Sequence, residues 1–247
     1  MLTNKVALIT GGVRRIGAEI AKTLHAEGMR LVIHYRSSRN EAQALQKSLN
    51  AIRADSVVLI QSDLLNSKGL GSLVQQTVDH FQQLDVLVNN ASSFYPTPIG
   101  KAEESDWDTL IGTNIKAPFF LSQAAAPYLK HTRGCIINIV DIHAQRPLKE
   151  HTIYSISKAA MTSLTQSLAH ELGPEVRVNG VSPGAILWPE AEGELDDIAK
   201  QRIISRTFLK RQGEPQDIAK AVLYFVRDAN YVTGQIISVD GGRSLHS

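Results

Sequence analysis

Lys5-Val-Ala-Leu-Ile-Thr10 is a short apolar run, and Gly11-Gly-Val-Arg-Arg-Ile-Gly17 follows it directly. Residues 18–28 then show the three- to four-residue apolar spacing of an amphipathic helix. A strand, a glycine turn and a helix in this order leave free N–H groups at the helix start, where they can bind a phosphate. The alternative is a tight turn without a ligand, because the glycine spacing departs from the G-x-G-x-x-G fingerprint.

The rest of the chain alternates short apolar runs with helical patterns. Further strands are expected at residues 30–36, 56–61, 84–91, 135–140, 176–182 and 235–239. Helices are expected at residues 18–28, 41–52, 66–81, 106–130 and 217–227, and a further helix that bears Tyr154 and Lys158 runs to about residue 172. Residues 92–98 form a proline-bearing loop, and residues 187–212 are predicted to be a lid or short helices. The pattern predicts one doubly wound α/β domain over residues 1–247, with a seven-stranded parallel sheet and helices on both faces.

Composition excludes several classes of partner. Hydrophobic residues make up 43% of the 247 positions and charged residues 20%, which suits a globular protein with a sizeable core. The net charge is only +2 and no basic run is present, so a nucleic-acid partner is not expected. No apolar stretch approaches the roughly 20 residues that cross a bilayer, and the first strand leaves no room for a signal peptide. With Cys135 as the single cysteine, a reducing, cytoplasmic location is predicted.

A second informative stretch runs from Asp141 to Lys158. Tyr154 and Lys158 stand four residues apart at the head of a helical pattern, so both project from one face. An ammonium beside a phenol favours the ionised phenol, and we expect Lys158 to lower the pKa of Tyr154 from near 10 towards neutrality. Such a phenol can act as a general acid. Asp141 follows the apolar run 135–140; it either joins this site or caps the next loop.

Three polar positions follow or accompany the predicted strands. Arg36-Ser-Ser-Arg39 stands after the second strand, where dinucleotide folds that bind NAD place an acidic residue. Guanidinium and hydroxyl groups suit a 2′-phosphate, so NADPH is favoured over NADH, the alternative being a solvated turn. Asp63 either accepts from an adenine amino group or caps the next helix. Asn114 lies in an apolar stretch and needs partners, either backbone groups or a water leading to Lys158.

Six motifs occur in order along the chain: Thr10-Gly11…Gly17, Asn89-Asn-Ala91, Asn114, Tyr154-x3-Lys158, Pro183-Gly184 and Asp240-Gly-Gly242. Together they resemble the short-chain dehydrogenase/reductase family over essentially the whole chain. The resemblance implies a Rossmann-type sheet, a nicotinamide cofactor, and Tyr154 as proton donor supported by Lys158 and Asn114. No metal is implied.

Two departures narrow the resemblance. Most members of the family have Gly where Arg15 stands and Ser where Asp141 stands, and both changes are typical of pteridine reductases. The run 89–98 and His34-Tyr35 before Arg36-Ser37 are similar to the same subfamily. This implies an NADPH-dependent reductase of dihydropterins or dihydrofolates that forms a homotetramer.

The resemblance also assigns site residues. It implies that the cofactor contacts strand ends and the turns after them: Gly11, Arg15, Ile16, His34, Tyr35, Arg36, Ser37, Asp63, Leu64, Asn90, Ala91, Ser92, Tyr154, Lys158, Pro183, Gly184 and Ile186. It implies a pterin site made of Arg15, Ser92, Phe94, Asp141, His151 and Tyr154, with Phe94 stacked on the ring. Two positions depart from the better-known members: His151 replaces an aromatic residue of the pocket, and the segment Arg243–Ser247 lacks their near-terminal Arg.

The chemistry explains why a carboxyl group suits position 141. Carbonyl reduction develops an alkoxide, which Ser and Tyr hydroxyls stabilise. Pterin reduction places a hydride on a ring carbon and a proton on the adjacent nitrogen, and a carboxyl group coupled to Tyr154 can relay that proton. The alternatives are a carbonyl reductase of the 3-oxoacyl or alcohol type, and a non-catalytic NADPH sensor; the intact Tyr154, Lys158 and Asn114 argue against the sensor.

Overall fold

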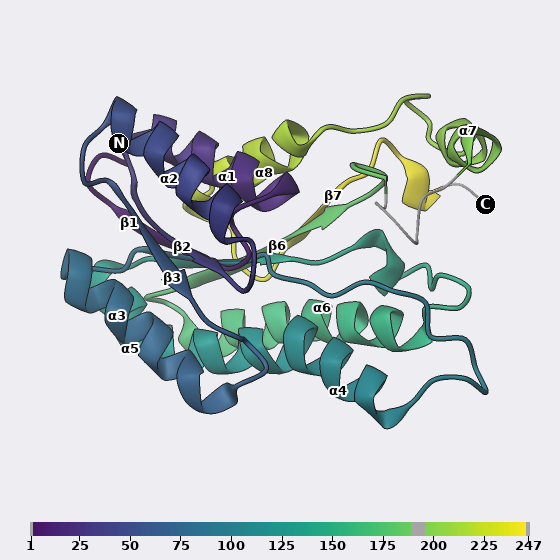
Figure 1. The fold of residues 1–247 in the computed structure, drawn as a ribbon, viewed down its shortest axis with the longest axis horizontal. Helices are drawn as coiled ribbons and strands as arrows, with labels where there is room; N and C mark the ends of the chain where they lie inside the picture. The colour runs from purple at the N-terminus through teal and green to yellow at the C-terminus, as the bar shows by residue number, and fades with distance from the viewer. Residues whose placement is uncertain (1, 189–195, 246–247) are drawn as a thin grey trace.

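Seven parallel strands form a single sheet in a computed structural model that describes residues 2–188 and 196–245 (Figure 1). The strand order is β3-β2-β1-β4-β5-β6-β7, so the chain moves outward from β1 and then returns to start again beside it at β4. The strands are β1 (Val6–Ile9), β2 (Arg30–Tyr35), β3 (Val57–Gln61), β4 (Val86–Asn89), β5 (Cys135–Ile139), β6 (Arg177–Pro183) and β7 (Ile236–Val239). The predicted doubly wound fold is confirmed. In such a sheet ligands bind beyond the carboxyl ends of the strands, where the order reverses.

Helices cover both faces of the sheet (Figure 1). One face carries α1 (Arg15–Ala26), α2 (Arg39–Ile52) and α8 (Pro215–Arg227). The other carries α3 (Leu70–Phe81), α5 (Ala117–Thr132) and α6 (Thr152–Leu172), with α4 (Glu104–Ile111) packed against α6. The short helix α7 (Asp197–Ser205) lies within the predicted lid, of which residues 189–195 fall outside the described part of the chain.

Two hydrophobic cores follow from the alternation of side chains along each strand. Ala7 and Ile9 of β1 pack into the core under α1, α2 and α8. Val6 and Leu8, their neighbours, pack into the core under α3, α5 and α6. Because a buried parallel strand is covered on both faces, it is apolar at every position, as the first run of the sequence is.

The predicted helical stretch over residues 106–130 is confirmed, but it is not one regular α-helix. The structure has α4, then a π-helical turn over Gly112–Lys116, then α5. Pro118 lies in the first turn of α5 and has no N–H to donate to the carbonyl of Asn114, four residues earlier. The widened turn therefore falls at Asn114, and such turns are frequent at functional sites. The other expected helices and strands are present, with ends shifted by a few residues.

Within the described residues, no helix is long and apolar enough to cross a membrane.

Candidate active site

Asp141, Tyr154 and Lys158 meet at the carboxyl end of β5. The Tyr154 hydroxyl donates to Asp141 Oδ2 at 2.8 Å. Asp141 Oδ1 accepts from the His143 N–H at 2.8 Å and so also caps the short 3-10 helix Ile142–Ala144. Lys158 Nζ donates to the Ile139 carbonyl at 3.0 Å and lies 5.6 Å from the centroid of the Tyr154 ring. Asp141 thus fills both roles that the sequence left open.

The electrostatics of this group differ from the prediction. The pKa of Tyr154 is raised well above its usual value of 10, first because the phenol is buried and then because Asp141 is its neighbour. The expectation that Lys158 draws this pKa towards neutrality is therefore wrong. Burial lowers the pKa of Lys158 to about 8, and Asp141 opposes that shift. At neutral pH the phenol keeps its proton and Lys158 is mostly charged, so the group holds a proton ready to donate.

Asn114 ties the loop after β4 to α6. Its Oδ1 accepts from the Ser93 N–H at 2.8 Å and the Ser92 hydroxyl at 3.1 Å. Its Nδ2 donates to the Ser93 carbonyl and to Ser157 Oγ, both at 3.0 Å. Of the two kinds of partner considered for Asn114, backbone groups are therefore present. Ser93 and Ser157 were not predicted, since isolated serines carry no pattern that separates them from surface residues.

The aromatic pair beside this group is Phe94 and His151. Their rings are stacked, with centroids 4.7 Å apart and planes at 18°. Phe94 also meets the Tyr154 ring edge-on at 4.8 Å. Phe94 is 44% exposed, so part of this side chain next to the Tyr154–Asp141 pair is accessible to a ligand. His151, which the resemblance assigns to the substrate pocket, thus contacts Phe94.

The glycine turn after β1 forms a backbone cradle. Gly11 has a φ of +58°, and a Cβ at Gly17 would lie 2.5 Å from the Gly11 carbonyl oxygen and 2.6 Å from Asn90 Nδ2. Asn90 Nδ2 donates to the Thr10 and Gly11 carbonyls at 2.9 and 3.0 Å, which fixes the turn against the end of β4. No side chain caps α1 and its first turn has no acidic residue. The N–H groups at the helix start, beside Arg15 and Ile16, therefore suit an anionic group.

His34 supports the cradle from β2. The Gly11 N–H donates to His34 Nδ1 at 3.2 Å, and His34 Nε2 lies 3.0 Å from the Ser62 carbonyl, to which it donates. Burial lowers the pKa of His34, so the ring is neutral at pH 7 and holds the turn in place. Tyr35 is buried beside it.

Basic and polar side chains follow β2 and β3. Arg36 and Ser37 are exposed just beyond the end of β2. The Arg36 carbonyl accepts from Gln61 Nε2 at 2.9 Å, which joins this turn to β3. Asp63 Oδ1 accepts from the Leu65 N–H at 3.0 Å and closes a turn, while Leu64 is buried.

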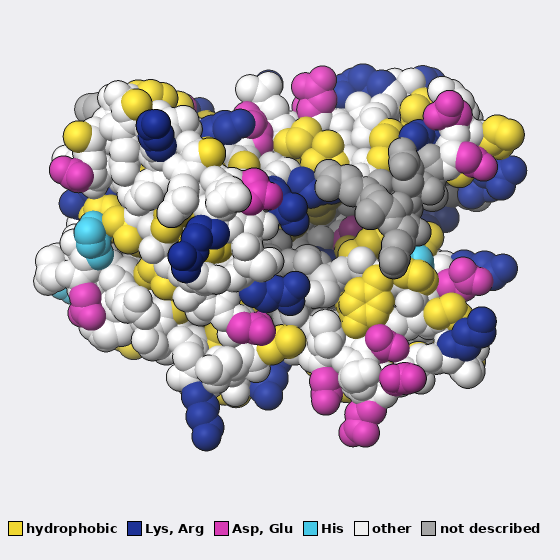
Figure 2. Space-filling model, in the orientation of Figure 1, with side chains coloured by type: hydrophobic (Ala, Val, Ile, Leu, Met, Phe, Trp, Pro, Cys, Tyr) yellow, Lys and Arg dark blue, Asp and Glu magenta, His cyan; other side chains and the backbone are white. Residues whose placement is uncertain are grey.

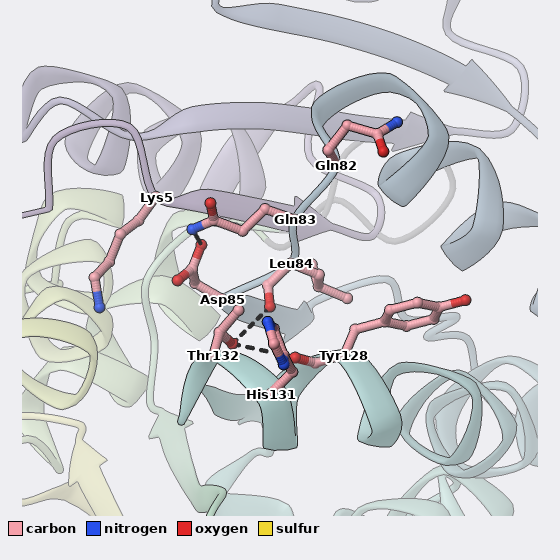
Figure 3. Close-up of a pocket in the computed structure, with 8 residues that line it drawn as sticks. All are labelled: Lys5, Gln82, Gln83, Leu84, Asp85, Tyr128, His131 and Thr132. Carbon is pink, nitrogen blue, oxygen red and sulfur yellow. Dashed lines mark hydrogen bonds between the residues drawn. The ribbon is translucent and has the colours of Figure 1, made fainter.

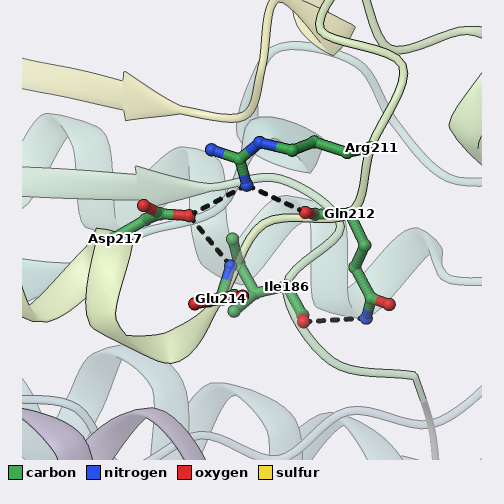
Figure 4. A network of polar contacts seen from close by, with 5 residues as sticks. All are labelled: Ile186, Arg211, Gln212, Glu214 and Asp217. Atoms are coloured by element: carbon green, nitrogen blue, oxygen red, sulfur yellow. Dashed lines mark hydrogen bonds and ion pairs between the residues drawn. The ribbon is translucent and has the colours of Figure 1, made fainter.

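The end of β6 is held against the start of α8 (Figure 4). A Cβ at Gly184 would lie 2.6 Å from Asp240 Cβ, so only glycine fits after Pro183. The Ile186 carbonyl accepts from Gln212 Nε2 at 2.8 Å (Figure 4). Arg211 pairs with Asp217 at 3.5 Å and fixes the same segment (Figure 4).

Arg15 connects the glycine turn to the start of the predicted lid. Its φ is +52°, a conformation that favours glycine, and its Nη2 donates to the Trp188 carbonyl at 3.1 Å. The face beyond the strand ends is hollowed between the two helical layers, with Lys and Arg side chains at its edge (Figure 2).

A different pocket, of about 410 Å³, lies at the opposite edge of the sheet, at the amino ends of β1 and β4 (Figure 3). Asp85 Oδ2 there accepts from the Val6 N–H at 2.8 Å and Gln83 Nε2 at 2.6 Å. The Asp85 carboxylate therefore links the starts of β1 and β4. Because this pocket lies at the amino ends of the strands, it is separate from the candidate active site at their carboxyl ends.

The donor set of the glycine turn and of the residues after β2 fits a dinucleotide. The cradle at Gly11 and Gly17 has no room for a Cβ, and cations follow β2. Among residues 2–188 and 196–245, no three His, Cys, Asp or Glu side chains are grouped to hold a metal ion.

Known proteins similar to this chain cover nearly all of it. A family model described as enoyl-(acyl carrier protein) reductase matches residues 11–244. Pteridine reductase 1 of Leishmania tarentolae is 35% identical, with 98% of this chain and 97% of that protein covered. The 3-oxoacyl-(acyl-carrier-protein) reductase FabG of Staphylococcus epidermidis is 34% identical, with 97% and 98% covered. FabG of Staphylococcus aureus is also 34% identical, with 98% and 99% covered.

Fold, site and relatives together define an oxidoreductase that uses a nicotinamide cofactor. The chain belongs to the short-chain dehydrogenase/reductase family, as its motifs predicted. Relatives with two different activities are similar to almost the same degree, so overall identity does not select the substrate.

Proposed function

We propose that this protein is an NADPH-dependent pteridine reductase that acts on a dihydropterin or a dihydrofolate. The observation that carries the proposal is the 2.8 Å hydrogen bond from the Tyr154 hydroxyl to Asp141 Oδ2, beside the partly exposed Phe94. A carboxylate coupled to a general acid suits a ring with N–H and amino groups to be bound. A relative named as a pteridine reductase supports the same choice.

In this proposal each residue of the group has a separate task. The glycine cradle would hold the phosphates of a reduced nicotinamide cofactor, which would supply the hydride for a ring carbon of the substrate. Tyr154 donates its proton to the adjacent ring nitrogen, and the Lys158 ammonium stabilises the phenolate that remains. Asp141 accepts from substrate amino groups and relays a proton to the phenol. Phe94 provides a stacking face, and Asn114 keeps its loop in register with α6.

Cofactor choice provides the first test. If Arg36 and Ser37 bind the 2′-phosphate, NADPH should be preferred over NADH by about 1.5–3 kcal/mol, the contribution of a charge-assisted hydrogen bond. Arg36→Asp should then lower kcat/KM for NADPH and leave that for NADH nearly unchanged. Steady-state kinetics with both cofactors measure this, and equal kcat/KM values for the wild-type protein would contradict it.

Ring stacking provides the second test. Phe94→Ala should weaken the binding of every pterin by about 1–3 kcal/mol, by analogy with base–aromatic stacking. The measurement is kcat/KM for several dihydropterins beside a small ketone. A loss confined to the ketone would show that Phe94 does not stack on the pterin ring.

The main competing proposal is a 3-oxoacyl reductase, because two relatives with that name are 34% identical to this chain. A spectrophotometric screen of NADPH oxidation with dihydrobiopterin, dihydromonapterin, dihydrofolate and an acetoacetyl thioester separates the two. Turnover of the thioester alone would overturn the pteridine assignment.

We further propose that residues 1–247 act as one NADPH-binding domain in a cytoplasmic homotetramer. Exposed aromatic side chains support self-association: Trp107 on α4, Phe119 and Phe120 on α5, and Tyr224 on α8. Sedimentation velocity tests the assembly, and a monomer at micromolar concentration would refute it.

A further inference from the structure

A pocket of about 330 Å³ opens next to Asp141. Three segments that are far apart in the sequence line it: Ile142, His143, Arg146 and Leu148 after β5, Arg206 after α7, and Arg243 and Ser244 after β7. Its volume is at the lower end of the range for small-molecule sites. Ile142 and His143 directly follow Asp141 in the chain, so the pocket begins one residue beyond the proposed reacting group.

The pocket brings together two arginines, Arg206 and Arg243, that have no ion-pair partner among the described residues. In the described part of the chain, no carboxylate lies within 4.0 Å of the guanidinium group of Arg206 or Arg243, whereas Arg211 nearby is paired with Asp217. Arg243 is partly buried, and its pKa is lowered by that burial and by Arg206, while Asp141 and Asp240 oppose the shift. Arginine nevertheless remains charged at any ordinary pH.

Among the described residues, the two acids that act on Arg243, Asp141 and Asp240, accept hydrogen bonds from other groups. Asp240 accepts from the Gly242 and Ser244 N–H groups at 2.9 and 2.6 Å. Asp141 accepts from Tyr154 and from the His143 N–H. Two neighbouring guanidinium groups in a partly buried pocket repel each other. A bound anion offsets this unfavourable electrostatic energy.

We propose that Arg206 and Arg243 form a subsite for the carboxylates of a substrate tail, so that the enzyme prefers a folate with its glutamate to an unconjugated pterin. The proposal rests on the pterin chemistry inferred above, since it assigns what is attached to the reacting ring. Asp141 and Arg206 both act electrostatically on Arg243, so a tail attached to a ring bound at Asp141 would extend towards the two guanidinium groups. Arginine matches carboxylates with paired N–H donors.

Direct binding tests the subsite without turnover. The probe is p-aminobenzoylglutamate, titrated calorimetrically into the full-length protein. Arg206→Gln and Arg243→Gln should each weaken binding roughly tenfold, the loss expected for one charge-assisted hydrogen bond. Arg206→Lys should retain part of the affinity. Arg202→Gln, which removes the same charge from α7 outside the pocket, should leave it unchanged.

Two binding results would overturn the proposal. One is equal affinity of the probe for the wild-type protein and for all of the glutamine variants. The other is tighter binding of inorganic phosphate than of the probe, which would assign the pocket to a phosphate instead of a carboxylate tail.

Kinetics separate the subsite from the proposed function. Arg206→Gln should raise KM for dihydrofolate roughly tenfold with kcat unchanged, and leave KM for dihydrobiopterin as it is. Equal changes for both substrates would overturn the subsite and leave the pteridine reductase assignment intact. If no pterin or folate is reduced but probe binding depends on Arg206 and Arg243, the proposed function fails while the carboxylate subsite stands.

Discussion

Tyr154→Phe should lower kcat for dihydropterin reduction by roughly 100-fold or more, the range for removal of a general acid. The phenol is buried and its pKa is raised well above 10 by that burial and by Asp141, so it carries its proton across the physiological pH range. Phenylalanine keeps the ring that packs edge-on against Phe94 and removes only the donor. Stopped-flow measurement of single-turnover NADPH oxidation isolates this step from product release.

The control for Tyr154→Phe is cofactor affinity. NADPH should bind the variant with nearly wild-type Kd in a fluorescence titration, because the loss concerns proton delivery. Lys158→Met should reduce turnover and also weaken the binding of NADPH, since the family resemblance assigns Lys158 to the cofactor ribose. Near-normal turnover in Tyr154→Phe would mean that another group, most simply Asp141, donates the proton.

Asp141→Ser should abolish most dihydropterin reduction. A hydroxyl cannot bind substrate amino groups or relay a proton as a carboxylate does. The same change restores the residue usual in the wider family, so reduction of a small ketone should increase slightly. If Asp141→Ser leaves dihydropterin turnover intact, Asp141 acts only as the cap of Ile142–Ala144, and the pteridine assignment then depends on Phe94 and Arg15.

The variants Asp141→Asn and Asp141→Ala divide binding from proton transfer. Asparagine keeps the shape and should harm kcat more than KM, whereas alanine should harm both. Removing the negative charge also lowers the pKa of Tyr154 from its raised value, because Asp141 is one cause of that shift. The basic limb of the pH–rate profile, where the phenol ionises, should therefore move to lower pH in Asp141→Asn. An unmoved basic limb would show that Tyr154 and Asp141 are not coupled.

The sequence by itself determined the order of strands and helices and the doubly wound sheet. Apolar periodicity is a local property, and a buried parallel strand such as β1 is apolar at every position because both of its faces are covered. The spacing of Tyr154 and Lys158 was also sufficient to place them on one face of α6. The π-helical turn at Asn114 could also have been predicted, because Pro118 removes a helical hydrogen-bond donor. It was not predicted because the apolar pattern of the helix continues through the turn.

Only the tertiary structure decided the electrostatics and the arginine pocket. The pKa of Tyr154 depends on burial and on the distance to Asp141, thirteen residues away, and spacing along α6 reports neither. Residues 142–148, Arg206 and Arg243 meet because β5 and β7 end at the same edge of the sheet and α7 lies beyond it. Charge and desolvation act through space, whereas a sequence pattern reports only neighbours along the chain, so the sign of the Tyr154 shift and the anion subsite become visible only in the folded protein.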